Sequence, residues 1–349
     1  MNKIKIIIWG FGAMGRGMAE MLLQKKGIEI VGVCDINPDY IDVDIQEILR
    51  VKANHPKVKV TNNIDQLLNT KKADVVLLAT DSFVEGAYDK IVKVITAKIN
   101  CISTAEEMAY PKANHPVMAS QIDQLAKAYG VTVLGTGINP GFIMDLLVVA
   151  LSGTMTDVKH IEAKRVNSLS PFGPAVMHEQ GVGISLDEYN FRIAENNLAG
   201  HVGFKESVHM ISDALGIKIE GFKQQMEPII TNVDRKSKYG EAKAGTLAGI
   251  NMTGQGLVGG NVFIDMIHPQ QIEPELEGIQ TGDYISLTGT PNIHMAINPE
   301  VEGGIGTIAM CVNMIPHVIN ARAGLKTMID LPVPRAILGD MRDLIEQDV

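Results

Sequence analysis

The chain opens with an apolar strand that runs directly into a glycine-rich turn, and this pattern constrains the fold more than any other feature. Residues Ile4–Trp9 are rich in isoleucine, which is typical of a buried parallel strand. The turn reads Gly10-Phe11-Gly12-Ala13-Met14-Gly15, and helical spacing follows over residues 14–24. A second apolar stretch, residues 28–33, leads into Asp35. Strand, glycines, helix, strand and acid in this order predict a dinucleotide-binding βαβ unit.

Each glycine of the turn has its own expected role. Gly10 allows the tight turn, Gly12 lets the backbone approach a pyrophosphate, and Gly15 lets the helix pack closely on the strand. The first amides of the helix then face the phosphates. The alternative interpretation is a glycine-rich turn in an unrelated α/β unit. The residues expected to contact the cofactor are Gly10, Phe11, Gly12, Ala13, Met14, Gly15, Arg16, Asp35, Thr80 and Asp81.

The choice of cofactor depends on Asp35 and Arg16. Asp35 comes 25 residues after Gly10, where a ribose-binding acid is expected. Its carboxylate would repel a 2′-phosphate, so we expect NAD as the cofactor. Arg16 lies on the first helix near the phosphates, so use of NADP stays open.

Size and charge narrow the class of protein. A chain of 349 residues is long for one core and predicts two domains. With 46% hydrophobic and 20% charged residues it is typical of a globular protein, and its net charge of −9 argues against a nucleic-acid partner. No apolar run reaches the roughly 18 residues of a membrane span, and no leader pattern is visible. We therefore expect a cytoplasmic protein with no membrane partner.

The cysteines and the spacing of possible metal ligands argue against a metal site and against covalent catalysis. The three cysteines, Cys34, Cys101 and Cys311, lie far apart and lack metal-site spacing, so we expect reduced, buried thiols. No cluster of histidine, cysteine and acidic residues has ligand spacing, and no nucleophile motif is visible. We expect neither a metal nor covalent catalysis.

The first domain is expected to span residues 1–141. Strands alternate with helices there, which predicts right-handed crossovers and a doubly wound parallel sheet of the Rossmann type. Ligands in such sheets bind beyond the carboxyl ends of the strands. The expected helices cover residues 65–69, 86–96 and 116–129, and the further strands cover 73–80, 100–103 and 131–135.

The second domain is expected to span residues 142–304. Polar and apolar residues alternate there with period two, which predicts an α+β domain with a mainly antiparallel sheet. We expect it to supply substrate contacts and the surface of a homodimer. The remaining segment, 305–349, begins with an apolar helix over 305–323 and is expected to pack back on the Rossmann domain. The expected second-domain strands are 158–166, 218–230, 262–268 and 283–289, and the helices 144–151, 185–199 and 207–215.

Glu106 and Glu107 are the candidate acid–base residues. They follow the end of a predicted strand, on the edge of the sheet where the nicotinamide is expected. The alternative is structural: Ser103 or Thr104 caps a helix, and the acids stabilise its first turn. Thr80 and Asp81 have a similar alternative, because they also precede a predicted helix.

Three residues are weaker candidates for binding substrate. Asn139 lies in the Gly137–Gly141 loop that links the domains, and it is expected to hydrogen-bond the substrate or the carboxamide. Arg165 ends an alternating strand and could clamp a carboxylate, although a surface salt bridge is the competing interpretation. His178 lies in a Gly/Pro-rich loop of the kind that covers a site, but a single histidine is more often structural.

Several stretches resemble known families. Residues 4–20, IKIIIWGFGAMGRGMAE, resemble the cofactor domain of dihydrodipicolinate reductases. ISTAEEMAYP (102–111), GTGINPGF (135–142) and GGIGTIAMCVNMIPHVINARAGLKTMIDLPVP (303–334) resemble the 2,4-diaminopentanoate dehydrogenase family, to which native amine dehydrogenases are related. The resemblance covers nearly the whole chain. The His-rich catalytic motif of dihydrodipicolinate reductases is missing, which argues against that activity.

The resemblance implies a reaction and a catalytic residue. It implies oxidative deamination of 2,4-diaminopentanoate to 2-amino-4-oxopentanoate in ornithine breakdown, with release of ammonia and reduction of NAD or NADP. It places the family's catalytic glutamate in the Glu106-Glu107 pair, with Glu106 preferred. The substrate would be a small diamino acid. The alternatives are a dehydrogenase of another amino acid or imine, such as a diaminopimelate-type substrate, and a non-catalytic NAD(H)-binding regulator.

Overall fold

The structure is a computed structural model that describes residues 2–198 and 200–346. The chain divides into two compact units, and each is described by itself. The first unit combines Met1–Phe142 with Gly303–Val349, and the second is Ile143–Glu302. The divisions expected after residues 141 and 304 lie within two residues of these limits. No helix in the described part of the chain is long and apolar enough to cross a bilayer.

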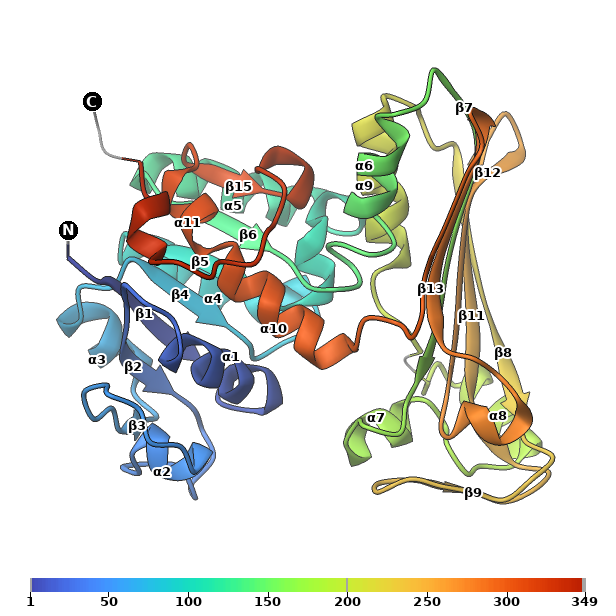
Figure 1. The fold of residues 1–349 in the computed structure, drawn as a ribbon, viewed down its shortest axis with the longest axis horizontal. Helices are drawn as coiled ribbons and strands as arrows, with labels where there is room; N and C mark the ends of the chain where they lie inside the picture. The colour runs from blue at the N-terminus through green and yellow to red at the C-terminus, as the bar shows by residue number, and fades with distance from the viewer. Residues whose placement is uncertain (1, 199, 347–349) are drawn as a thin grey trace. The chain divides into compact units, whose positions relative to one another are not determined.

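A seven-stranded sheet forms the centre of the first unit (Figure 1). Its strand order is β15-β6-β5-β4-β1-β2-β3, and every neighbouring pair is parallel. The predicted Rossmann sheet is therefore confirmed. The strands are β1 (Ile4–Trp9), β2 (Ile28–Cys34), β3 (Val60–Thr61), β4 (Val75–Leu78), β5 (Asn100–Ser103), β6 (Thr132–Gly135) and β15 (Gly324–Lys326).

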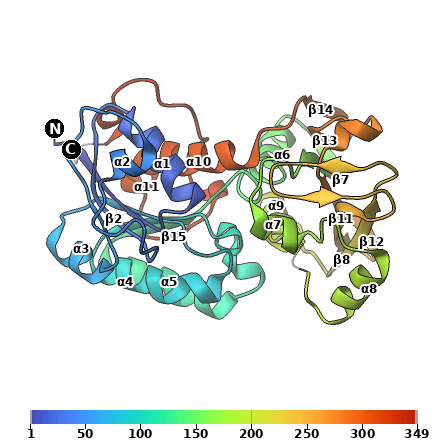
Figure 2. The same ribbon diagram turned by 90° about the horizontal axis from the view of Figure 1, so that it is seen from below.

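Helices cover both faces of this sheet. Figure 2 shows α4 and α5 along one face and α1, α10 and α11 along the other. Apolar residues of α4 and α5, such as Ile91 and Ile122, are fully buried against the sheet, and burial of each contributes about 1.5–3 kcal/mol. The helices are α1 (Ala13–Leu23), α2 (Ile45–Leu49), α3 (Ile64–Thr70), α4 (Val84–Thr96), α5 (Pro116–Tyr129), α10 (Gly303–Asn313) and α11 (Ile315–Asn320).

The last part of the chain returns to the first unit, where it completes the sheet. The single helix expected over 305–323 is two helices, α10 and α11, which meet at Met314. Pro316 explains the break, because proline has no N–H for the helical ladder. β15 then pairs with β6 and forms the edge of the sheet. Its three residues are too few for a periodic pattern, so the sequence does not predict this strand. Short 3₁₀ turns are η1 (Glu106–Ala109), η2 (Pro111–Ala113), η4 (Met328–Asp330) and η5 (Met341–Leu344).

The second unit is built on a six-stranded sheet of order β14-β13-β7-β12-β11-β8. Its neighbours are antiparallel except for β7 and β12, which are parallel. The predicted mainly antiparallel sheet is confirmed. The strands are β7 (Asp157–Ser168), β8 (Gly221–Ile230), β11 (Leu247–Val258), β12 (Asn261–Gln271), β13 (Gly282–Thr290) and β14 (Ile293–Ile297), and β9 (Arg235–Lys236) and β10 (Glu241–Ala242) form a separate pair.

One face of this second sheet is covered by helix α9. A Cβ on Gly254 would lie 2.8 Å from the ring of Phe204, so glycine there lets the helix approach the sheet closely. The helices are α6 (Leu146–Ser152), α7 (Pro174–Glu179), α8 (Leu186–Ala194) and α9 (Phe204–Leu215), with a 3₁₀ turn η3 (Pro274–Glu277). The helix expected over 185–199 ends earlier, at Ala194, and Ala199 lies outside the described residues.

Candidate active site

The glycine-rich turn joins β1 to α1 with little space for side chains. Gly10 has a φ of +95°, the left-handed region that favours glycine, and its N–H donates to the Cys34 carbonyl at 2.8 Å. A Cβ on Gly15 would lie 1.9 Å from the Gly10 carbonyl oxygen, so the helix could not pack so closely with any other residue. A Cβ on Gly12 would meet no atom within 4 Å. Gly12 therefore faces open space, where a ligand can approach the backbone.

The start of α1 fits a bound phosphate. Gly12 is its N-cap, and as a glycine it has no side chain to accept a hydrogen bond from the first-turn amides. The first turn also holds no acidic residue, so none of its own side chains neutralises the helix dipole. Ala13 and Met14 begin this turn, and the Arg16 side chain bonds the Gly12 carbonyl at 3.3 Å. The geometry fits the pyrophosphate of a dinucleotide.

Asp35 lies directly after β2, beside the glycine turn. Its carboxylate accepts hydrogen bonds from the Phe11 N–H and from the Asn37 N–H, the latter at 2.7 Å. These bonds hold the carboxylate at the carboxyl end of the strand. In a dinucleotide-binding fold this is the place of the adenosine ribose, so the residue fits the ribose-binding role.

The turns after β1 and β4 touch each other. The Ala79 N–H donates to the Trp9 carbonyl at 2.8 Å, and a Cβ on Gly10 would lie 2.9 Å from Thr80 Cγ2. Thr80 donates to the Asp81 carboxylate, which also pairs with Lys90 at 2.6 Å. The N-cap of α4 is Phe83, without a side-chain bond, so neither residue caps that helix. β4 ends at Leu78, two residues before the end of the strand expected over 73–80. Thr80 therefore lies beyond the strand.

Glu107 is held in place by the protein. Its side chain is 10% exposed, and Oε2 accepts the Val84 N–H at 2.8 Å at the start of α4. The same oxygen lies 3.1 Å from Nε2 of His115, a partner that the sequence did not single out. The Glu107 carboxylate thus ties α4 to the segment after β5 and to the start of α5.

Glu106 precedes it and is half-exposed at the start of η1. The N-cap of η1 is Ala105, without a side-chain bond, and the Ser103 hydroxyl accepts only the Ala105 N–H, at 3.2 Å. The expected cap by Ser103 or Thr104 is therefore not found on η1. Of the two acids, Glu107 has a structural role and Glu106 keeps part of its surface open.

The loop with Asn139 follows β6 in the first unit. The Thr136 N–H donates to the Ser103 carbonyl at 3.0 Å, which joins the turns after β5 and β6. The Ile138 N–H donates to the Thr307 hydroxyl of α10 at 3.2 Å. Asn139 is half-buried between these anchors. The first unit therefore collects the glycine turn, Asp35, Thr80, Asp81, Glu106 and Asn139 along the carboxyl edge of one sheet.

Arg165 lies in the interior of the second unit rather than on its surface. Its side chain is 2% exposed, its Nη1 is 2.6 Å from Asp283, and its Nη2 donates to the Val301 carbonyl. Burial lowers the pKa of Arg165 and raises the pKa of Asp283. The attraction between the two charges acts in the opposite direction on both pKa values, but burial is the larger cause. The competing surface salt bridge is therefore wrong: the ion pair is buried. A role of Arg165 in binding substrate stays a prediction.

His178 lies in α7 and is exposed, with Nε2 3.5 Å from the Arg192 guanidinium. The structure shows a different histidine cluster that sequence reasoning did not assemble. The rings of His201 and His268 are 4.7 Å apart, and His268 Nε2 lies 2.9 Å from Asn167 Oδ1. Burial lowers the pKa of His201 to about 3. The alternation of apolar and polar residues along β7 and β12 could have placed Asn167 and His268 on the covered face of the sheet. It could not have shown that the two side chains are in contact.

The thiols offer no nucleophile. All three cysteines are buried and free, and burial raises the pKa of Cys34 to about 11 and those of Cys101 and Cys311 to about 12. Thiols with such pKa values stay protonated near neutral pH. Among residues 2–198 and 200–346, no group of three or more His, Cys, Asp or Glu side chains is placed to hold a metal ion.

Comparison with known proteins agrees with the geometry. Residues 142–347 match the C-terminal domain of 2,4-diaminopentanoate dehydrogenase, and residues 4–105 match the N-terminus of dihydrodipicolinate reductase. The chain is 57% identical over 349 residues to a 2,4-diaminopentanoate dehydrogenase of Acetoanaerobium sticklandii, covering 100% of this chain and 99% of the relative. It is 23% identical to an amine dehydrogenase of Streptomyces virginiae, covering 96% and 98%.

A solved structure shares the fold. The amine dehydrogenase of Mycobacterium smegmatis superposes with a TM-score of 0.85 at 23% identity, covering 96% of this chain and 98% of that one. A Rossmann fold whose glycine turn fits a dinucleotide, together with these relatives, identifies an NAD(P)-dependent oxidoreductase. The chain belongs to the 2,4-diaminopentanoate dehydrogenase family.

Proposed function

We propose that this enzyme deaminates 2,4-diaminopentanoate at C4, with NAD as the cofactor, and releases 2-amino-4-oxopentanoate and ammonia. The identity of 57% over the full chain to a 2,4-diaminopentanoate dehydrogenase carries this substrate assignment. The geometry of the first unit supports the reaction class, because a half-exposed glutamate lies at the same sheet edge as the glycine turn.

The reaction balances with the amine substrate, one water and NAD(P)⁺ as the only reactants. The protonated amine loses a proton, C4 loses a hydride, and water adds to the resulting iminium to form a carbinolamine. Ammonia then leaves and the ketone forms. When bound, NAD(P)⁺ accepts the hydride. The protein must therefore remove a proton from the amine, position one water, and move a proton from that water's oxygen.

Glu106 is proposed for the proton steps. Glu107 is the poorer candidate, since its carboxylate already accepts the Val84 N–H and contacts His115. Glu106 lies one residue nearer the end of β5 and is more exposed. A carboxylate there can take the amine proton, pass it to solvent through its exposed side, and then accept a proton from the water that attacks C4. Glu107 would act as a positioning residue that fixes η1 against α4.

The remaining predicted residues divide by role. Gly10–Gly15 and Arg16 are proposed to hold the pyrophosphate, Asp35 the ribose, and Thr80 and Asp81 the region next to the nicotinamide. Asn139 is proposed to bind the substrate or the carboxamide. Arg165 and His178 remain weaker proposals for substrate binding, because Arg165 is buried in its pair with Asp283 and His178 contacts Arg192.

The substrate is tested by direct assay. Purified enzyme with NAD⁺ and 2,4-diaminopentanoate should form NADH and release ammonia in equal amounts. Ornithine, lysine and diaminopimelate serve as competing substrates, and each should react far more slowly. Faster turnover of diaminopimelate, or NADH formation without ammonia, would contradict the substrate assignment.

The two glutamates are separated by substitution. We expect Glu106→Gln to lower kcat by about 10²–10⁴-fold with little change in NAD⁺ affinity, since it removes the proton carrier. Glu107→Gln should lower the melting temperature, because the buried carboxylate loses its charge beside the α4 amides and His115. If Glu107→Gln abolishes turnover in a normally stable protein while Glu106→Gln does not, the roles are reversed.

Assembly, location and pathway complete the proposal. One face of the six-stranded sheet carries half-exposed side chains such as Glu162 and Thr253, which suits a homodimer. A place in ornithine degradation and a cytoplasmic location are consistent with the proposed substrate and the reduced thiols. Sedimentation equilibrium at micromolar concentration tests the dimer, and a monomer mass would contradict it.

A further inference from the structure

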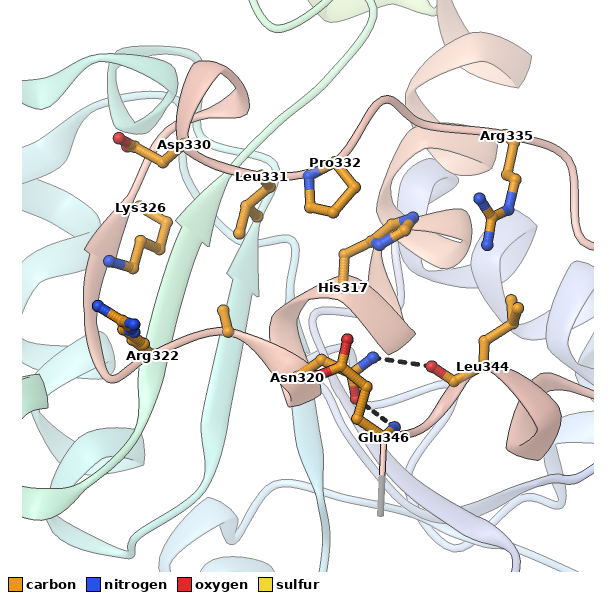
Figure 3. Close-up of a pocket in the computed structure, with 11 residues that line it drawn as sticks. His317, Asn320, Arg322, Lys326, Asp330, Leu331, Pro332, Arg335, Leu344 and Glu346 are labelled. Carbon is orange, nitrogen blue, oxygen red and sulfur yellow. Dashed lines mark hydrogen bonds between the residues drawn. The ribbon is translucent and has the colours of Figure 1, made fainter. Parts of the chain in front are cut away.

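The first unit contains a pocket separate from the glycine turn. Its volume is about 370 Å³, within the lower part of the range for small-molecule sites. It lies between α11, β15 and the segment of residues 327–346, which we call the C-terminal segment (Figure 3). None of its lining residues belongs to the turns after β1, β2 or β4. The proposed dehydrogenase reaction does not use this space.

Cationic side chains surround the pocket. Arg322, Lys326 and Arg335 line it, although the chain as a whole has a net charge of −9. None of the three forms a side-chain hydrogen bond or ion pair with another described residue. Two acids, Asp330 and Glu346, also line the pocket, and the Asp330 carboxylate accepts hydrogen bonds from the N–H and hydroxyl of Thr327, both at 2.8 Å. With three cationic and two acidic side chains, the lining carries one net positive charge.

His317 adds a second, independent signal. It projects from α11 into the group of lining residues (Figure 3) and is 7% exposed. Its Nε2 is buried and has no hydrogen-bond partner among the described residues. A buried polar atom left without a partner costs about 1–3 kcal/mol, so native proteins keep few of them. Burial, and then the charge of Arg335, lower the pKa of His317.

The opposite side of the pocket is fixed to the rest of the unit. Asn320 at the end of α11 donates to the Leu344 carbonyl at 2.7 Å and accepts the Glu346 N–H at 3.0 Å. Lys25 donates to the Ile337 carbonyl at 2.6 Å, which anchors the middle of the C-terminal segment to the end of α1. These contacts anchor the C-terminal segment to α11 and to the chain just after α1.

We propose that this pocket is a second ligand site, which binds a small organic phosphate ester. Guanidinium and ammonium groups both bind phosphate oxygens, and Arg322 and Lys326 lie together on one side of the pocket (Figure 3). Arg335 lies on the opposite side, beyond His317 and Pro332, where it faces the rest of the ligand. Leu331, Pro332 and Leu344 form apolar parts of the wall. Inorganic phosphate alone would leave most of the volume empty, whereas the carbon skeleton of an ester can cover that wall. This site is independent of the proposed substrate.

Calorimetric titration of the NAD⁺-saturated enzyme tests the site. Saturation occupies the glycine turn, so added phosphate cannot bind there. The probes are glucose 6-phosphate and glycerol 3-phosphate, with inorganic phosphate, glucose and citrate as comparisons. We expect an ester to bind more tightly than inorganic phosphate, no binding of glucose, and weaker binding of citrate. Ester titration should also shift the Nε2 resonance of His317.

Substitutions locate the binding in the pocket. Arg322→Gln and Arg335→Gln, both at exposed residues, should each weaken ester binding by at least about tenfold. Lys72→Gln is the matched control, because Lys72 is exposed and does not line the pocket, and it should leave binding unchanged. No ester binding up to about 10 mM, binding insensitive to both arginine substitutions, or tighter binding of citrate would each overturn the proposal.

Discussion

Two residues of the glycine turn must be glycine for different reasons. Gly15 is needed for packing, because a Cβ there would lie 1.9 Å from the Gly10 carbonyl oxygen. Gly12 is needed for ligand access, since a Cβ there meets nothing in the protein within 4 Å. The same substitution at these two positions should therefore have different consequences.

We expect Gly15→Ala to destabilise the fold by about 1–3 kcal/mol through overpacking, and to lower the melting temperature by several degrees. Gly12→Ala should melt like the parent enzyme but bind NAD⁺ at least about tenfold more weakly, because the new methyl occupies the approach of the pyrophosphate. Calorimetric melting and NAD⁺ titration check both. A Gly12→Ala variant with normal affinity would place the pyrophosphate elsewhere.

Asp35 is the residue that should decide between the two nicotinamide cofactors. In Asp35→Asn the negative charge is lost, so a 2′-phosphate is no longer repelled. We expect kcat/KM for NAD⁺ to fall by about 10–100-fold and the ratio of NADP⁺ to NAD⁺ activity to rise. Asp39→Asn, at an exposed neighbour, is the control. Activity that is already higher with NADP⁺ in the parent enzyme would contradict the NAD preference.

At the scale of elements, the covered face of the six-stranded sheet contains a polar cluster in which Arg165, Asn167 and His268 are buried and His201 is half-buried. The strands β7 and β12 supply Arg165, Asn167 and His268, and the segment before α9 supplies His201. Burial comes first among the causes that lower both histidine pKa values, followed by neighbouring positive charge. Both rings are therefore neutral in the folded protein at pH 7.

This cluster should make the enzyme sensitive to acid. The folded-state pKa of His201 is about 3, below the value near 6.5 of an unfolded chain. Unfolding therefore takes up protons between about pH 6.5 and pH 3, and the free energy of unfolding falls as the pH falls through this window.

His201→Gln should reduce this dependence by about one proton, or about 1.4 kcal/mol per pH unit near pH 4.5. Urea unfolding at several pH values measures the slope. His294→Gln, which removes an exposed imidazole, is the matched control. An unchanged slope in His201→Gln would show that the ring is not kept neutral by the fold.

Elements also show where sequence patterns stop being informative. The sequence predicts a helix over residues 116–129, and α5 has the same bounds, because a proline begins it and Gly130 ends it in the left-handed region. The sequence does not predict β11, because Gly249, Gly254 and Gly256 weaken the strand pattern there. In the structure Phe204 and Val208 of α9 fill the space beside two of these glycines. Packing between distant segments, not local propensity, decides that strand.

At the scale of the whole molecule, the first unit is built from two distant parts of the chain. β15 completes the sheet beside β6, and α10 packs along α1, where a Cβ on Gly17 would lie 2.1 Å from Ile308. The second unit, by contrast, is one continuous stretch, Ile143–Glu302. The two units should therefore respond differently to truncation.

We expect residues 143–302, expressed alone, to fold with dispersed NMR signals, because they include their own buried core. Residues 1–142 alone should not fold cooperatively, since the edge of β6 and the apolar surface under α10 and α11 become exposed. Adding residues 303–349 through a flexible linker should restore NAD⁺ binding. Cooperative thermal unfolding of 1–142 by itself would contradict this view.

The sequence by itself determined the Rossmann unit, the glycine turn, Asp35 and the acid pair, because these depend on local spacing: strand period, turn glycines and helix start. Only the tertiary structure decided that Glu107 contacts Val84 and His115, that Arg165 is paired with Asp283, and that the last residues complete the first sheet. These facts join residues far apart in the chain. A periodic sequence pattern cannot show which distant side chain contacts a buried charge. In the folded protein the partner is selected because an unpaired buried charge is energetically costly.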